Sequence, residues 1–119
     1  MDEETQRIYD EANKARISGD YETALPLLET AVRACPDAAC CWWALGHVLL
    51  NTGDFDRAIA RMQKATELEP ANLKYILDLA KSLEMLGEYD QARPILERVI
   101  ELDGESREAA EARKNLSYY

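Results

Sequence analysis

Three cysteines and one histidine are the side chains of this sequence best suited to hold a metal ion or to act as nucleophiles. Cys35, Cys40 and Cys41 lie within one short stretch, and the single histidine, His47, follows. On a helix the backbones of Cys40 and His47 stand about 10 Å apart. That separation is too long for zinc ligands, which lie about 2.0–2.3 Å from the ion, and for a hydrogen-bonded Cys–His nucleophile. We therefore expect that the protein binds no metal and no cofactor, has no catalytic residue and is not an enzyme.

The three cysteines also form no obvious disulfide framework. Their number is odd, and adjacent Cys40 and Cys41 on one helix point about 100° apart, so that a bond between them would distort the helix. We expect three free thiols: Cys35 in the turn before Pro36 and most reactive, Cys40 near a groove edge, and Cys41 partly packed.

Composition excludes several classes of function. Among 119 residues the formal net charge is −9 and 47% of the residues are hydrophobic, which is typical of a folded globular chain. A nucleic acid or an anionic membrane would be repelled, and no apolar run is long enough for a spanning helix. The N-terminus has neither the basic nor the apolar segment of a secretory signal. We expect a cytoplasmic protein that binds neither nucleic acid nor membrane, and whose many carboxylates form a solvated face.

A repeat of 34 residues runs through the chain. Gly19, Gly53 and Gly87 show it most clearly, and seven further columns share the register. These columns are Ile8/Trp42/Ile76, Ala12/Gly46/Ala80, Tyr21/Phe55/Tyr89, Ala24/Ala58/Ala92, Leu28/Met62/Leu96, Ala31/Ala65/Val99 and Pro36/Pro70/Gly104.

Each column has a physical reason that indicates a helical hairpin. The glycine suits a left-handed residue after a first helix, and Asp20 or Asp54 can cap the second helix, with Glu88 a weaker version. The small residues of the Gly46 and Ala58 columns let two antiparallel helices approach closely. Pro36 and Pro70 end the second helices, while Pro26 and Pro94 are expected to be tolerated early within them. Because these glycines end helices and lie 34 residues apart, they do not form the closely spaced glycine run of a phosphate-binding loop.

These residues resemble the tetratricopeptide repeat family. The middle repeat carries Trp42, Leu45, Gly46, Gly53, Ala58, Ala65 and Pro70 at the signature positions of that family. The resemblance implies an all-α, right-handed superhelical stack of three antiparallel helix-turn-helix repeats and seven helices, forming a single domain over residues 1–119. The repeats are predicted at 5–38, 39–72 and 73–106, with a C-terminal capping helix at about 105–117.

The resemblance further implies a concave groove lined by the first helix of each repeat. The residues carried over to that groove are Gln6, Tyr9, Asn13, Arg16, Cys40, Trp43, His47, Leu50, Lys74, Leu77, Asp78, Lys81 and Glu84. Trp42 occupies the core column, and Trp43 lies about 100° further round the helix. We therefore expect Trp43 to present its indole to the groove as an anchor for a partner, although it could instead lie flat over a neighbouring repeat.

The expected function is a protein-interaction module, an adaptor or scaffold that holds a peptide segment of a partner in this groove. Chaperone-binding members of the family hold the C-terminal carboxylate of a heat-shock protein with two lysines, two asparagines and an arginine. The matching positions here are Tyr9, Asn13, Ala44, Lys74 and Asp78, and only Asn13 and Lys74 agree. That partner is therefore not expected. The alternative is a scaffold that self-associates through the groove or the Tyr118–Tyr119 end, so that the chain is a monomer or a weak homo-oligomer.

Overall fold

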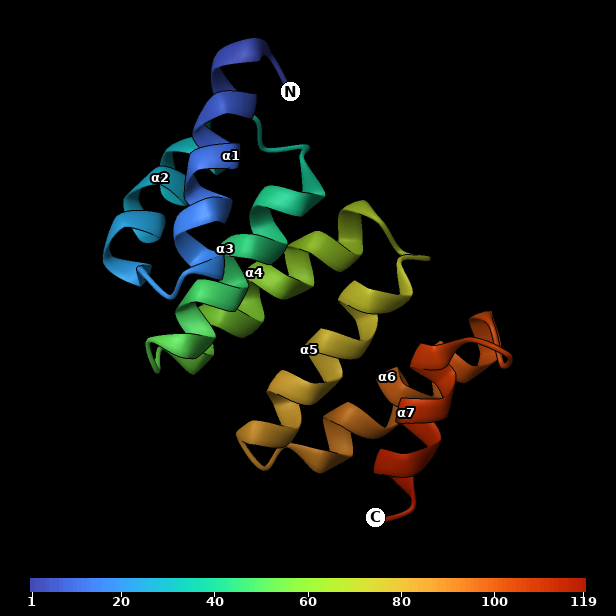
Figure 1. Ribbon diagram of the computed structural model, residues 1–119. Helices are drawn as coiled ribbons and strands as arrows, with labels where there is room; N and C mark the ends of the chain where they lie inside the picture. Colours follow the sequence, from blue (N-terminus) through green and yellow to red (C-terminus); the bar gives the residue numbers. More distant parts are fainter. The chain divides into compact units, whose positions relative to one another are not determined.

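The computed structural model describes all residues from 1 to 119, and every regular element in it is an α-helix (Figure 1). The helices are α1 (Glu3–Ile17), α2 (Tyr21–Ala34), α3 (Ala39–Asn51), α4 (Phe55–Leu68), α5 (Leu73–Met85), α6 (Tyr89–Leu102) and α7 (Arg107–Leu116). The all-α prediction with seven helices is confirmed. None of the helices combines the length and hydrophobicity that crossing a membrane requires.

The chain divides into two compact units, Met1–Leu68 and Glu69–Tyr119. In the first unit α1 packs on α2 and α3 on α4, while α2 also packs on α3 and α1 touches α3. In the second unit α5 packs on α6, and α7 packs on both of them. Helices α3 and α5 begin at the first residues predicted for the second and third repeats.

The repeated glycines reverse the chain between the helices of each pair. Gly19, Gly53 and Gly87 have φ angles of 82°, 85° and 76°, values that other residues adopt only with strain. After Gly19 the carboxylate of Asp20 accepts a hydrogen bond from the backbone N–H of Thr23 at 3.3 Å, as a helix cap does. Glu88 makes no such side-chain bond. The sequence register therefore predicts these turns correctly.

Gly46 shows why the small-residue columns are needed. A Cβ atom built there would lie 2.7 Å from the Cγ of Met62 and 3.1 Å from the carbonyl oxygen of Ala58. The backbone of α3 therefore rests directly on α4, and a side chain at Gly46 would force the two helices apart. At the equivalent positions of the other pairs, Ala12 and Ala80 are fully buried.

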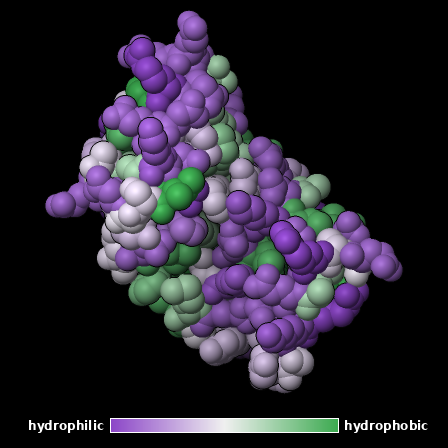
Figure 2. Space-filling model, viewed as in Figure 1, coloured by the Kyte–Doolittle hydropathy of each residue, from purple (hydrophilic) through white to green (hydrophobic).

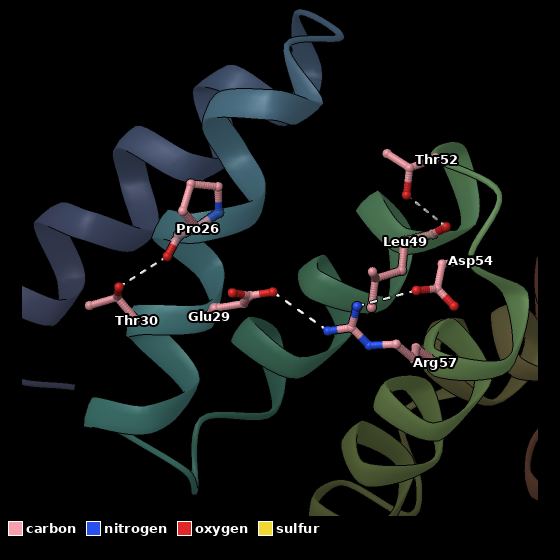
Figure 3. A network of polar contacts seen from close by, with 7 residues as sticks. All are labelled: Pro26, Glu29, Thr30, Leu49, Thr52, Asp54 and Arg57. Carbon is pink, nitrogen blue, oxygen red and sulfur yellow. Dashed lines mark hydrogen bonds and ion pairs between the residues drawn. The ribbon is translucent and has the colours of Figure 1, made fainter.

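Surface contacts join α2 to α4 in the first unit. The guanidinium of Arg57 lies 3.5 Å from a carboxylate oxygen of Glu29 and 3.2 Å from one of Asp54 (Figure 3). All three side chains are partly exposed, so these pairs add little stability. In the same view Pro26 lies within an unbroken α2, where its carbonyl accepts a hydrogen bond from the Thr30 hydroxyl at 3.0 Å. The expected tolerance of this proline is confirmed.

The core of the second unit is closed by α7. The buried residues of this core are Ile76, Leu77, Ala80, Leu96, Val99, Ala109 and Ala112, with Leu73, Ile95, Ile100 and Leu116 packed against them. Ser106 caps α7 by accepting the backbone N–H of Ala109 at 3.0 Å. The predicted capping helix thus exists and buries one face. Elsewhere hydrophobic residues reach the surface only in small separate patches among hydrophilic ones, on the side that Figure 2 shows.

Candidate functional site

The first helices of the first unit present the face predicted for ligand binding. Six predicted residues there are partly exposed, and together they define the α1–α3 face: Tyr9, Asn13, Arg16, Cys40, His47 and Leu50. The spacing of three or four residues along each helix brings them to one side, and the contact between α1 and α3 places the two rows next to each other.

Arg16 is the best-fixed side chain on the α1–α3 face. Its Nε and Nη2 both donate to the Oδ1 of Asn13, at 3.0 and 2.6 Å, one turn earlier on α1. Its guanidinium carbon lies 4.9 Å from the ring centroid of Trp43, within the range of a cation–π contact. The guanidinium of Arg16 is therefore restrained both by its hydrogen bonds to Asn13 and by its contact with the Trp43 ring.

His47 completes this cluster from α3. Its Nδ1 lies 3.5 Å from Nη1 of Arg16 and 3.3 Å from Nδ2 of Asn51. A guanidinium and an amide nitrogen can only donate, so Nδ1 is the acceptor in these two contacts. The imidazole also lies 5.4 Å from the Trp43 ring, tilted by 36°.

The expected exposure of Trp43 is wrong. Only 7% of its surface is accessible, because the ring lies beneath Arg16 of α1 and beside His47. The other reading, a tryptophan lying flat against a neighbouring repeat, describes it better. Trp42 is instead partly exposed: its Nε1 donates to the carbonyl of Pro36 at 2.8 Å, and Arg61 of α4 lies over its ring at 5.6 Å. Trp42 thus ties the turn before α3 to α4.

In the second unit four of the five predicted residues of α5 line a pocket shared with α7. This α5–α7 pocket, of about 250 Å³, is lined by Lys74, Leu77, Asp78, Lys81, Arg107, Glu108 and Glu111. Lys81 donates to a carboxylate oxygen of Glu111 at 2.8 Å, and that hydrogen bond raises the pKa of Lys81. Both side chains are nearly half exposed, so the bridge is available for exchange with a ligand.

Sequence reasoning missed the α7 side of this pocket, although a signal was present. Glu108 and Glu111 lie 34 residues after Lys74 and Leu77, so extending the repeat into the capping helix would have found them. Leu77 itself differs from expectation: it is 4% exposed and belongs to the core of the second unit. It forms the floor of the pocket and not a free apolar anchor.

Glu84 does not lie in the α5–α7 pocket. Its two carboxylate oxygens accept from the Asn115 amide at 3.0 Å and from the Tyr119 hydroxyl at 2.9 Å, so it fastens the end of α7. With Tyr89, Arg93 and Tyr118 these three residues line a second hollow of about 520 Å³, here called the tyrosine pocket. Burial, then the hydrogen bond to Glu84, raises the pKa of Tyr119 to about 12.

The three cysteines differ in accessibility. Cys35 follows the last residue of α2 and is partly exposed, as is Cys40, whereas Cys41 is fully buried. Burial, reinforced by the neighbouring Cys40 thiol, raises the pKa of Cys41 to about 12. Its thiol lies 3.5 Å from the sulfur of Met1. The structure brings no three His, Cys, Asp or Glu side chains together in a way that could hold a metal ion.

We predict that iodoacetamide at pH 8 modifies Cys35 and Cys40 well before Cys41. The thiolate is the reacting species, and a group with a pKa of about 12 is almost entirely protonated at pH 8. Peptide mapping by mass spectrometry over a time course measures the three rates, and protein unfolded in guanidinium serves as the control in which the rates converge. Equal rates in the native protein, or a pair that resists alkylation until a reductant is added, would contradict this account.

Comparison with known proteins decides the family. The tetratricopeptide repeat profile matches residues 15–67 and again residues 52–116, which together cover most of the chain. The chain belongs to the tetratricopeptide repeat family. Members of this family mediate protein–protein interactions, and the repeat is typically a non-enzymatic interaction module.

Relatives of known sequence are much longer than this tetratricopeptide repeat chain. It is 32% identical over 75 residues to human Superkiller complex protein 3, covering 63% of this chain and 5% of that protein. It is 30% identical over 97 residues to the TPR repeat-containing protein YpiA of Bacillus subtilis, covering 82% of this chain and 23% of that protein. The chain therefore spans a small part of the length of these relatives.

Solved structures share the fold. MamA, residues 41 to the end, from Desulfovibrio magneticus superposes with a TM-score of 0.83 at 26% identity, covering 88% of this chain and 59% of that one. The first tetratricopeptide repeat domain of Spaghetti (RPAP3), bound to the HSP90 peptide SRMEEVD, superposes with a TM-score of 0.85 over 96% of this chain and 90% of that one. At 19% identity the second likeness establishes the fold alone.

Proposed function

We propose that this tetratricopeptide repeat chain binds a peptide segment of a partner protein through the α1–α3 face of its first unit. The observation that carries the proposal is the set of partly exposed polar, aromatic and aliphatic side chains that α1 and α3 present side by side. Such a mixture suits a peptide, because backbone amides find polar partners while apolar side chains find Tyr9 and Leu50.

The proposed ligands do not include the C-terminal carboxylate of a heat-shock protein. Of the five positions that would form the clamp, Ala44 is fully buried and its side chain has no hydrogen-bond donor. Asp78 would repel a carboxylate, and Tyr9 supplies no positive charge. We expect the peptide SRMEEVD, which the Spaghetti domain binds, to show no measurable affinity for this chain in isothermal titration calorimetry.

A peptide-display selection followed by NMR tests the proposed function. Twelve-residue random peptides, displayed without a free C-terminus, are selected on the 119-residue chain, and a selected peptide is titrated into the ¹⁵N-labelled protein. We expect the largest chemical-shift changes in α1 and α3. Changes concentrated in α2, α4 and α6, or a library that yields no binder, would reject the proposal.

Self-association is the second candidate, and the tyrosine pocket is the observation that favours it. Tyr118 is 78% exposed and Tyr89 53% exposed beside a hollow of about 520 Å³, an aromatic surface of the kind that protein contacts use. Size-exclusion chromatography with light scattering over a wide concentration range separates the two candidates. A monomer at every concentration removes self-association, whereas a dimer abolished by Tyr118→Ala supports it.

A further inference from the structure

Arg16 is the only formally charged residue on the α1–α3 face. The other five residues of that face are neutral side chains, and the whole of α3, from Ala39 to Asn51, contains no Asp, Glu, Lys or Arg. The chain as a whole carries a net charge of −9. A single positive group on an otherwise uncharged face, in an acidic chain, marks a place where one negative group of a ligand would be favoured.

The contacts of Arg16 leave a defined part of the guanidinium open. Asn13 accepts from Nε and Nη2, and His47 faces Nη1, so three of the five N–H groups are engaged. One N–H on each of Nη1 and Nη2 remains for a carboxylate of a ligand. The partners that Arg16 has within the first unit are an amide, an imidazole and an indole, none of which neutralises its charge.

The guanidinium is also pre-oriented. The contact with the Trp43 ring restrains its position, and the two hydrogen bonds to Asn13 restrain its rotation. An exposed arginine loses side-chain entropy when it binds a ligand, but most of that loss has already occurred here, so that more of the interaction appears as affinity.

We propose that Arg16 binds the carboxylate of one Asp or Glu side chain within an otherwise uncharged peptide segment. This inference rests on the proposed function and names the chemistry of the ligand. A single acidic side chain is favoured because the face offers one cation, and each further negative charge would meet only the field of the acidic chain. A side chain is favoured over a chain terminus because it can reach down to the partly buried guanidinium while the peptide backbone lies above it.

The test is a charge reversal combined with the displayed-peptide selection. We expect peptides selected on the wild type to share an Asp or Glu at one position, and Arg16→Gln to weaken the binding of the best peptide by about tenfold or more. Arg16→Lys keeps the charge but loses the paired geometry, so it should give an intermediate loss. Selection on Arg16→Glu should replace the acidic position by Lys or Arg.

The controls separate this inference from the proposed function. Arg7→Gln removes an exposed arginine of the same helix outside the α1–α3 face, and its affinity should equal that of the wild type. The synthetic peptide is used with an amidated C-terminus, and its Glu→Gln or Asp→Asn form should bind Arg16→Gln and wild type alike. Thermal melts followed by circular dichroism confirm that each variant folds.

Three outcomes would overturn the inference. Binders without any shared acidic residue, or equal affinity of wild type and Arg16→Gln, would leave the peptide-binding function standing and reject the role of Arg16. A peptide that binds only with a free C-terminus would show that Arg16 binds the terminal carboxylate and not that of an Asp or Glu side chain. A library without binders would reject the proposed function itself.

Discussion

Removal of residues 105–119 should destabilise the second unit and reduce the solubility of the chain. The fully buried Ala109 and Ala112 leave with α7, as does Leu116, and the apolar surface around Ile95 and Val99 loses its cover. Terminal repeats need such a cap because each helical hairpin has an apolar face that it cannot bury alone. We expect a lower melting temperature, less helical signal than the lost residues account for, and association at micromolar concentration, measured by circular dichroism and light scattering.

A pair of point variants provides the matched control for this truncation. Ala112→Asp places a carboxylate in the core and should cost about 3 kcal/mol or more, because the charge finds no partner there. Ala110→Asp adds the same side chain to the exposed side of α7 and should leave the melting temperature nearly unchanged. A truncated chain that stays monomeric and melts like the full chain would show that α7 is not a cap.

The sequence predicts backbone features well, because the residues that recur in each repeat are those that the local backbone conformation or a close helix contact requires. A positive φ at Gly53, or a close helix contact at Gly46, admits few residue types, so the residue type itself reports the geometry. The same logic identifies α7 as a cap from the apolar spacing of Ala109, Ala112 and Leu116.

Side-chain exposure was predicted less well. The position of a residue on a helix determines the direction of its side chain, but it does not show which neighbouring element covers that side. Trp43 points about 100° away from Trp42, as expected, but α1 lies on that side and covers it. A signal for this was available: α3 has no charged residue, and a helix that is uncharged all round is buried on most sides. Glu84 was misplaced for a related reason, since its partners Asn115 and Tyr119 come from the end of the chain, outside the three repeats.

Replacing Trp43 should therefore cost far more stability than its predicted exposure implied. Trp43→Ala empties a site in which the ring is 7% exposed, and loss of a buried aromatic side chain typically costs about 3–5 kcal/mol. Trp42→Ala should cost less, because that ring is already partly in solvent and loses mainly its bond to Pro36 and its contact with Arg61. Urea unfolding followed by far-UV circular dichroism gives both values, and Trp43→Phe, which keeps an aromatic ring, should fall between wild type and Trp43→Ala.

The same variant separates a structural role of Trp43 from a binding role. Because Arg16 rests on this indole, Trp43→Phe should weaken peptide binding less than Arg16→Gln does while weakening the fold more. A tryptophan that contacts the ligand directly would reverse that order, with a large loss of affinity and little loss of stability. Equal stability losses for Trp42→Ala and Trp43→Ala would mean that both rings are packed alike, and that the two sides of α3 have been assigned wrongly.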